Sequence, residues 1–185
     1  VPLSGVGRAM DGDSLMVGVR NLIHNRPDPD WLLRPDVRAA LAILEEREIE
    51  SKLTKLRSVL VDQGIFENPR TKLLIFTEHK DTLDYLVKNL REWKLTVGQI
   101  HGSMKPGSRD EEGTRLNAER NFWDLKTQVL VATEAAGEGI NLQFCWLMIN
   151  YDIPWNPVRL EQRMGRIHRY GQEKDCLIFN FVSTN

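Results

Sequence analysis

The sequence predicts an α/β domain in which helices cover both faces of a parallel sheet, preceded by a helical N-terminal segment. The first observation is a set of short, continuous apolar runs, such as Lys72 to Thr77 (KLLIFT) and Gln128 to Thr133 (QVLVAT). Unbroken apolar runs of this length are typical of strands that are buried on both faces. The second observation is that amphipathic helical segments separate these runs, which is the pattern of repeated strand–helix–strand units.

Strands and helices alternate along the second part of the chain, from residue 66 to residue 185. The expected strands cover 72–77, 96–101, 128–133, 146–151 and 176–182. The expected helices cover 80–93, 109–123 and 157–170. The first of these helices is supported by apolar residues at helical spacing, namely Leu83, Leu86, Val87 and Leu90.

The first 65 residues are expected to form a helical extension to this α/β domain. Ser14 can cap a short helix that runs to about His24. Asp36 is the expected N-cap of a long helix that reaches about Val61, and Gly64 provides a stop signal.

Composition excludes some classes of protein and leaves others open. Lys plus Arg number 25 against 26 Asp plus Glu, so any surface that binds nucleic acid must be a local one. Hydrophobic residues make up 41%, which is enough for a packed core. The apolar stretches are shorter than the roughly 20 residues needed to cross a bilayer. Val1 to Met16 also lacks the layout of a signal peptide.

Cys145 and Cys176 have no Cys or His neighbour at metal-ligand spacing. We therefore expect two buried free thiols, no metal site and a reducing, cytoplasmic environment. The chain starts with Val1 rather than with Met, which suggests a fragment excised from a longer protein.

Three segments near strand ends carry candidate chemistry, because ligands bind at the carboxyl ends of parallel strands. In the first, HGSM, Gly102 permits close approach of the backbone and Ser103 can donate to a phosphate. The second, TEAAGEGIN from Thr133, has small residues that suit a turn with amide groups facing a phosphate or sugar. A plain turn is the alternative in both cases. No Gly-x-x-x-x-Gly-Lys-Ser/Thr pattern occurs, so neither segment is a Walker A loop.

The third segment reads QRMGRIHRYGQ and starts at Gln162. On a helix, Gln162, Arg166 and Arg169 fall on one face at four- and three-residue steps. Two guanidinium groups and an amide then form a donor array suited to phosphate oxygens. The alternative is an exposed, salt-bridged helix face, with Arg159 and Arg163 forming a second stripe.

These segments, in this order, resemble the C-terminal helicase domain of superfamily II, specifically its SWI/SNF-related branch, from about Ser51 to the chain end. SKLTKLRSVL resembles the helix before motif IV, and KLLIFTEHKDTLDYL resembles motif IV itself. IHGSM resembles the phosphate-contacting loop that follows, and VLVATEAAGEGINLQ resembles motif V. INYDIPWNP resembles the DNA-facing segment, and LEQRMGRIHRYGQ resembles motif VI with the Gly-Gln ending of this branch. The resemblance implies a RecA-like fold.

The resemblance also implies roles for the residues of motif VI. Arg166 and Arg169 match arginine fingers that reach ATP bound on a first lobe. Gln162 and Gly165 match residues that support those arginines and the nucleotide.

The resemblance implies further roles at motif V and in the loops around it. Gly137, Gly139 and Asn141 match the turn that couples the nucleotide site to the nucleic-acid site. The implied nucleic-acid contacts are Gly102, Ser103, Thr133, Trp155 and Asn156.

The implied enzyme needs a first lobe with a P-loop lysine and an acidic motif that hold ATP and Mg²⁺. Neither pattern occurs in these 185 residues. We therefore expect ATP-dependent translocation along duplex DNA by an intact two-lobe enzyme, and neither a bound cofactor nor hydrolysis in this chain alone. One alternative is a non-catalytic RecA-like module that binds nucleic acid or protein. Another is an unrelated doubly wound domain that binds a nucleotide by itself.

Two features depart from the pattern of the family. Glu138 stands where many relatives have an apolar residue, and the stretch Pro106 to Arg120 is longer than usual. The longer stretch favours a bacterial or archaeal sub-branch, with a cytoplasmic, nucleoid-associated location.

Overall fold

The computed structural model describes residues 35–134, 142, 144–168 and 174–182. The chain divides into two compact units, Val1–Arg57 and Ser58–Asn185. The short helix expected from Ser14 lies outside the described residues. Within the ranges that are described, no helix is long and apolar enough to span a membrane.

The long helix α2, Pro35–Asp62, matches the long helix expected from the sequence. Its stop at Gly64 is confirmed, since this glycine has φ +64°. The Gly64 N–H donates to the Val61 carbonyl at 2.9 Å, and the Ile65 N–H donates to the Leu60 carbonyl at 3.0 Å. These two bonds satisfy carbonyls of the last turn, and the left-handed conformation they require favours glycine.

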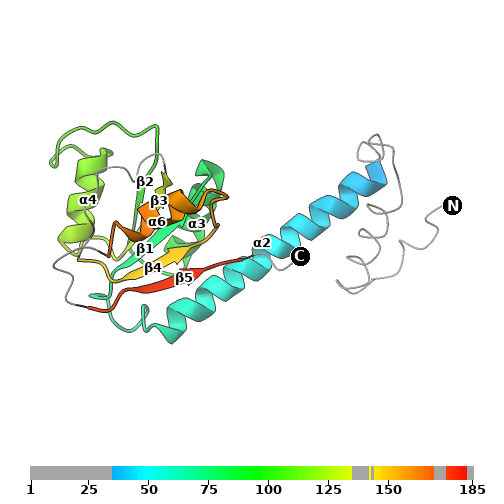
Figure 1. The fold of residues 1–185 in the computed structure, drawn as a ribbon, viewed down its shortest axis with the longest axis horizontal. Helices are drawn as coiled ribbons and strands as arrows, with labels where there is room; N and C mark the ends of the chain where they lie inside the picture. Colours follow the sequence, from blue (N-terminus) through cyan, green and yellow to red (C-terminus); the bar gives the residue numbers. More distant parts are fainter. Residues whose placement is uncertain (1–34, 135–141, 143, 169–173, 183–185) are drawn as a thin grey trace. The chain divides into compact units, whose positions relative to one another are not determined.

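The described strands form one parallel sheet in the order β2-β3-β1-β4-β5 (Figure 1). The strands are β1 Leu73–Thr77, β2 Val97–Ile100, β3 Val129–Thr133, β4 Leu147–Asn150 and β5 Leu177–Asn180. The helices that follow α2 are α3 Lys80–Glu92, α4 Arg115–Trp123 and α6 Pro157–Met164. Each strand lies within the range expected from the sequence, so the predicted parallel α/β fold is confirmed.

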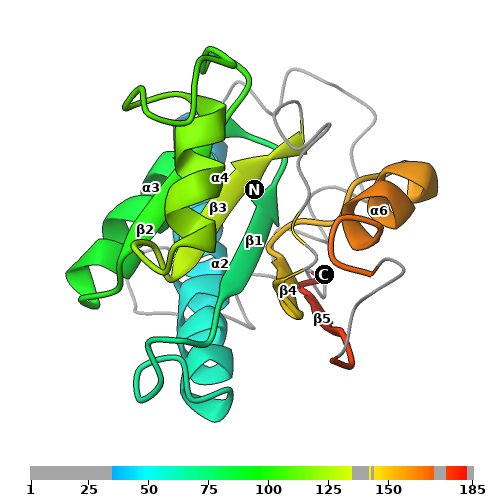
Figure 2. The same ribbon diagram turned by 90° about the vertical axis from the view of Figure 1, so that its left-hand side faces the viewer.

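The path of the chain puts helices on both faces of this sheet. The connection from β1 to β2 passes over β3 in one direction, whereas the connections from β2 to β3 and from β4 to β5 run in the opposite direction. Because crossovers between parallel strands are right-handed, α3 lies on one face and α4 on the other (Figure 2). The same rule places α6 on the side of α4.

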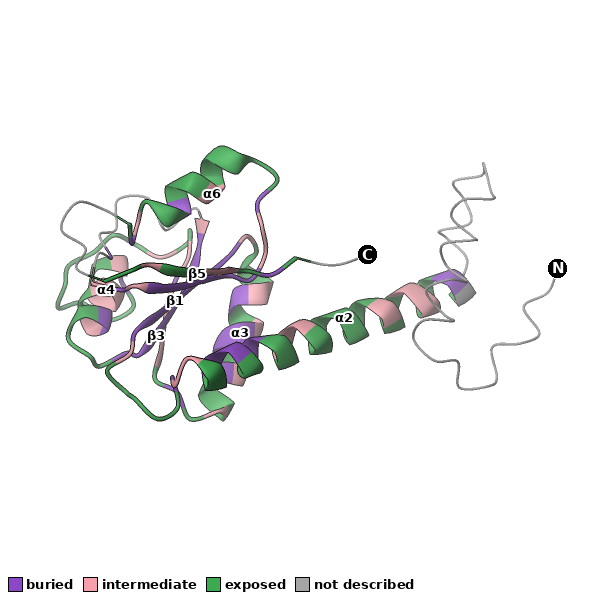
Figure 3. Ribbon diagram, turned by 60° about the horizontal axis from the view of Figure 1, so that its bottom comes forward, coloured by how far each residue is buried: buried purple, intermediate pink, exposed green. Residues whose placement is uncertain are grey.

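The central strands β1, β3 and β4 are buried along their whole length, whereas β2 and β5 at the sheet edges are partly exposed (Figure 3). On the face that α4 covers, Phe122 and Ile167 pack with side chains from the central strands. These strand residues are Leu74, Phe76, Leu130, Ala132 and Met148. Full burial of such a side chain contributes roughly 1.5–3 kcal/mol, so this layer is a stable platform for the loops at the strand ends.

The helix that was expected to start at Arg109 begins only at Arg115. Thr114 is its N-cap, because the hydroxyl oxygen of Thr114 accepts a hydrogen bond from the Asn117 N–H at 3.3 Å. The same hydroxyl lies 2.8 Å from the Ser108 carbonyl, so the preceding loop closes on the cap. The expected start at Arg109 was therefore wrong. An N-cap residue has non-helical backbone angles, so the chain before Thr114 is a loop.

Helix α6 ends at Met164 with Gly165 as its C-cap, whereas the sequence predicted a helix to Tyr170. Tyr170 lies outside the described residues. Arg166 therefore lies in the turn after the helix, and the expectation that Gln162 and Arg166 share the face of one continuous helix was wrong.

Neither cysteine forms a disulfide bond, so both are thiols, as predicted. Cys145 is buried, and this burial raises the pKa of its thiol to about 12, which keeps the thiol protonated and unreactive. Cys176 is only partly buried, so the expectation of a buried thiol was wrong at this position.

Candidate functional site

The candidate site is the edge of the sheet at which the parallel strands end. The strand register places Thr77 beside Thr133, and Phe76 beside Asn150. Because all strands run in one direction, the residues that directly follow β1, β3 and β4 meet at this edge.

Arg163 of α6 lies at the centre of this edge and is only 2% exposed. Its Nε donates to Glu134 Oε1 at 3.3 Å, and its Nη1 donates to Asn150 Oδ1 at 3.2 Å. Nη1 also donates to the backbone carbonyl of Asp152 at 2.8 Å. The guanidinium carbon lies over the Phe76 ring, 5.4 Å from its centroid, in a cation–π contact. One buried side chain thus joins the ends of β3 and β4 to α6.

Asp152 links the same cluster to the end of β1. Its Oδ2 accepts a hydrogen bond from the Thr77 hydroxyl at 2.5 Å, and its Oδ1 accepts from the Glu78 N–H at 2.8 Å. Asp152 Oδ1 also lies 3.6 Å from Arg163 Nη2. A buried charge is stable only with such partners. We define the Arg163 network as Thr77, Glu134, Asn150, Asp152 and Arg163.

Arg166 lies beside this network, and its side chain has a different environment. Its backbone N–H donates to the Arg163 carbonyl at 3.0 Å, and its own carbonyl accepts from the Leu142 N–H at 3.3 Å. Its side chain is partly exposed, and no carboxylate of the described residues forms an ion pair with it. By contrast, Arg159 pairs with Glu134 at 3.1 Å. Arg159 and Arg163 therefore fit the alternative of a salt-bridged helix face. The guanidinium group of Arg166 can donate to an external anion.

The loop after β2 is shaped by Arg115 of α4. The Nε of Arg115 donates to the Met104 carbonyl at 3.0 Å, and its Nη2 donates to the Gly102 carbonyl at 2.9 Å. Ser103 lies between these two residues and is exposed, with its Oγ 2.9 Å from Nδ1 of His101. The backbone of Gly102 and the hydroxyl of Ser103 are thus both at the surface.

His101 has a lowered pKa, chiefly because burial disfavours the charged imidazole. The positive charges of Lys80 and Arg115 lower this pKa further, and the carboxylate of Asp84 opposes them. The imidazole is therefore neutral near pH 7, and its Nδ1 can accept a hydrogen bond from the Ser103 hydroxyl.

The other predicted residues around this edge differ in exposure. Thr133 is 5% exposed at the end of β3 and directly precedes Glu134 of the Arg163 network. Trp155 is fully exposed. Asn156 is the N-cap of α6, and its Oδ1 accepts from the Val158 N–H at 3.0 Å. The exposed indole is thus placed next to the start of the helix that carries Arg163.

Residues 51–171 match the family described as the helicase conserved C-terminal domain. The chain belongs to this family. The predicted resemblance to the C-terminal domain of superfamily II helicases is therefore confirmed. The parallel sheet is the RecA-like fold that was expected.

Two curated relatives show how much of a longer protein this helicase C-terminal domain matches. "Uncharacterized ATP-dependent helicase YqhH" of Bacillus subtilis (strain 168) is 49% identical over 112 residues, which are 60% of this chain and 19% of the relative. The ATP-dependent RNA helicase p62 of Drosophila melanogaster is 32% identical over 150 residues, which are 81% of this chain and 20% of the relative. The domain therefore spans about a fifth of the length of these two relatives.

Solved structures share the fold of the helicase C-terminal domain. The E. coli DEAD-box protein SrmB, bound to regulator of ribonuclease activity A, matches with a TM-score of 0.59 and 24% identity over 72% of this chain and 71% of that chain. The C-terminal part of the Fun30 ATPase domain matches with a TM-score of 0.56 and 23% identity over 90% of this chain and 47% of that chain.

Sequence reasoning gave the buried Arg163 no functional role. A signal was present, because Glu134 directly follows the buried strand β3 and Asp152 lies just beyond β4. Carboxylates that close to buried strands need a cation or hydrogen-bond donors nearby. Glu134, Asp152 and Arg163 together could thus have been predicted as a cluster of the helicase C-terminal domain.

Four predicted residues lie outside the described residues, and their roles stay predictions. They are Gly137, Gly139, Asn141 and Arg169. No metal-binding group of three or more His, Cys, Asp or Glu side chains occurs in the described part of the chain.

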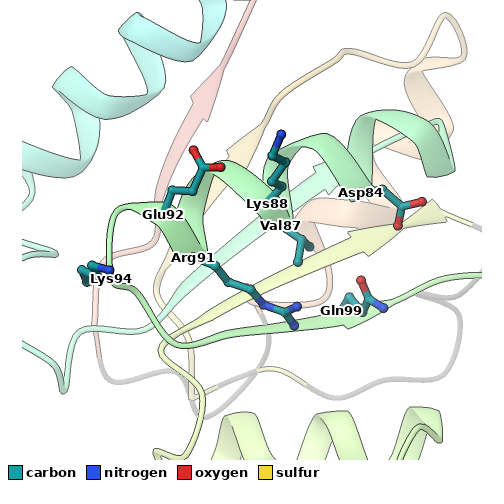
Figure 4. Close-up of a pocket in the computed structure, with 7 residues that line it drawn as sticks. All are labelled: Asp84, Val87, Lys88, Arg91, Glu92, Lys94 and Gln99. Atoms are coloured by element: carbon teal, nitrogen blue, oxygen red, sulfur yellow. The ribbon is translucent and has the colours of Figure 1, made fainter.

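Away from the carboxyl edge, the helicase C-terminal domain has a shallow hollow of about 600 Å³ between α3 and β2 (Figure 4). Its lining residues are Asp84, Val87, Lys88, Arg91, Glu92, Lys94 and Gln99. Arg91 Nη2 donates to the Val97 carbonyl at 3.2 Å. Cations and carboxylates are mixed around the hollow, and none of the predicted site residues lines it.

Proposed function

We propose that this chain is the second motor lobe of an ATP-dependent nucleic-acid helicase or translocase. The observation that carries the proposal is the contrast along α6 and the turn after it. The Arg166 side chain is partly exposed and has no carboxylate partner among the described residues, whereas Arg159 and Arg163 are paired. Arg166, together with Arg169, would face ATP held by a separate first lobe. Two guanidinium groups in that position stabilise the negative charge on the transferring phosphoryl group.

ATP and Mg²⁺ belong to the intact two-lobe enzyme in this proposal. The 185 residues contain no Gly-Lys-Ser/Thr sequence, so this chain alone has no P-loop to hold the phosphates and is proposed to be inactive. An arginine finger adds roughly 10³–10⁵ in rate, or roughly 4–7 kcal/mol, to a nucleotide that other groups already hold. Gln162 and Gly165 support the arginines in this proposal.

The proposed nucleic-acid contacts lie on the same edge of the sheet. Gly102 and Ser103 are exposed in the loop that Arg115 holds, where a backbone amide and a hydroxyl can donate to a phosphate. Trp155 offers a fully exposed indole beside Asn156. In the intact enzyme, Gly137, Gly139 and Asn141 would couple these contacts, together with Thr133, to the nucleotide.

We further propose duplex DNA as the track and the SWI/SNF-related branch as the subfamily. Support comes from the Gly171-Gln172 ending of motif VI, which resembles the ending typical of that branch. A duplex DNA track and the bacterial relative would together fit a cytoplasmic, nucleoid-associated protein. RNA is the second candidate track, because several relatives are named as RNA helicases.

The test is an ATPase assay on a protein that carries this lobe together with its ATP-binding lobe. Arg166→Ala should reduce turnover by roughly 10³-fold or more, because a finger has been removed. Arg159→Ala, a change in an exposed arginine of α6, should leave turnover unchanged. Near-normal turnover of Arg166→Ala would refute the finger role and favour a non-catalytic binding module.

The same assay tests the track. Matched duplex DNA, single-stranded DNA and RNA are added in turn to the unmodified protein, and turnover is compared at equal nucleotide concentration. Stimulation by duplex DNA above the other two supports the proposal. Stimulation of turnover by RNA alone would contradict the proposal of a DNA track and identify RNA as the track.

A further inference from the structure

We infer that Arg163 is a positioning residue that couples the nucleic-acid edge of this domain to Arg166. This inference rests on the proposed function, since it concerns how nucleic acid stimulates the proposed ATPase. The residue does not face the proposed nucleotide, because it is 2% exposed and bound to groups within the domain.

The first step of the argument is the direct link between Arg163 and Arg166. The Arg166 N–H donates to the carbonyl of Arg163 at 3.0 Å, so the backbone that carries one arginine holds the backbone of the other. The side chain of Arg163 is in turn fixed by partners from β3, β4 and the residues after them. The position of Arg166 therefore follows the position of those strand ends.

The second step is that the partners of Arg163 lie next to the proposed nucleic-acid contacts. Glu134 directly follows Thr133, and Asp152 precedes Trp155 by three positions in the loop from β4 to α6. A movement of either segment against a nucleic-acid backbone would reach Arg163 through one hydrogen bond.

The third step is the fork geometry of the guanidinium. Nε donates to Glu134 at 3.3 Å, and Nη1 donates to the carbonyl of Asp152 at 2.8 Å. Two nitrogens of the planar guanidinium group thus hold the segment after β3 and the segment after β4 at the same time. A lysine carries the same charge on a single nitrogen and cannot bridge both segments with that geometry.

The network also has a hydrogen bond left to form. Among the described residues, Nη2 of Arg163 makes no hydrogen bond, and its ion-pair distance to Asp152 Oδ1 is 3.6 Å. N–H···O hydrogen bonds lie at roughly 2.7–3.2 Å, so a shift of this loop by a fraction of an ångström would form the bond. The cluster is thus built to tighten when its segments move together.

The experiment uses a protein that carries both lobes and compares Arg163→Lys with Arg159→Lys. ATPase turnover is measured with and without duplex DNA and with RNA, and kcat and KM for ATP are determined separately. In Arg163→Lys, the stimulated kcat should fall by roughly 10–100-fold, because bound nucleic acid no longer moves the fingers the last fraction of an ångström to an ångström into place. The unstimulated kcat and the KM should change little. Arg159→Lys alters an exposed partner of the same Glu134 and should keep full stimulation.

The outcomes separate this inference from the proposed function. Full stimulation in Arg163→Lys, with turnover lost in Arg166→Ala, overturns the coupling role and leaves the finger role intact. Equal loss of stimulated and unstimulated turnover shows a merely structural role and also overturns the inference. If Arg163→Lys fails to fold in a urea titration, Glu134→Gln replaces it, because this change keeps the guanidinium and weakens its link to β3. A folded Glu134→Gln variant with full stimulation overturns the inference.

Discussion

Arg163 and Arg115 hold neighbouring parts of the same sheet edge, and they differ in burial and in the groups they bind. Arg163 is 2% exposed and binds side chains that include Glu134 and Asn150. Arg115 is partly exposed and donates to the backbone carbonyls of Gly102 and Met104. Removing a buried cation takes a charge partner from its carboxylates at a large cost, whereas water replaces an exposed donor at small cost. The Arg163 side of the edge is therefore expected to be held more strongly than the Arg115 side.

The largest expected effect comes from removing the buried arginine. Arg163→Ala should lower the free energy of unfolding by about 3 kcal/mol, the lower end for a broken buried ion pair, because Glu134 and Asp152 are partly exposed and can rehydrate. Arg159→Ala is the matched control and should cost less than about 1 kcal/mol, as exposed ion pairs do. Urea titration followed by circular dichroism measures both. Equal losses of unfolding free energy in the two variants would show that the buried arginine stabilises the fold no more than the exposed one does.

The next effect concerns the loop before α4, on the Arg115 side. Gly107 has φ +55°, and an added Cβ would collide with Cγ2 of Thr114. Gly107→Ala should therefore cost about 2–3 kcal/mol, from left-handed strain and a displaced side chain. Gly113 has φ +78° and nothing within 4 Å of an added Cβ, so Gly113→Ala should cost only about 1 kcal/mol of strain. A larger loss for Gly113→Ala in thermal unfolding would contradict the packing of Thr114 against Gly107.

A smaller effect is expected from Arg115→Ala, which removes two hydrogen bonds to exposed backbone. The free energy of unfolding should fall by about 1 kcal/mol. Binding of a fluorescent DNA duplex, measured by anisotropy, should weaken, because the Ser103 loop loses its support. Arg91→Ala removes a similar bond, from an arginine of α3 to the Val97 carbonyl at the start of β2, and should leave DNA binding unchanged. Equal DNA affinity in the two variants would show that the Ser103 loop does not contribute to nucleic-acid binding.

The smallest expected effect is a pH dependence of the same loop. Because the pKa of His101 lies below its ordinary value of 6.5, the imidazole gains its proton only in more acidic solution. DNA affinity should therefore rise as the pH falls below 6.5, by less than roughly tenfold, since one cation adds about one phosphate contact. The folded state loses stability over the same range, because the unfolded chain binds this proton more tightly. His101→Asn should flatten the pH profile of binding, and a profile identical to that of the unmodified chain would exclude His101 as its source.

Local sequence patterns predicted the central strands well because these strands are apolar and buried on both faces. The run expected at 72–77 forms β1, Leu73–Thr77, and the run at 128–133 forms β3, Val129–Thr133. The helix ends were less predictable, because they depend on groups outside the helix. The start at Arg115 depends on the loop that closes on Thr114.

The sequence by itself determined the order of strands and helices and the motifs of a helicase C-terminal domain, and it predicted the carboxyl edge as the place of the candidate site. Only the tertiary structure decided which arginine is buried. Arg163 and Arg166 both belong to motif VI, but folding brings Glu134, 29 residues away in sequence, to the first of them. The energy of an ion pair depends on the distance between the two charges in space, and a local sequence pattern does not give that distance. The role of each arginine is therefore a property of the folded chain.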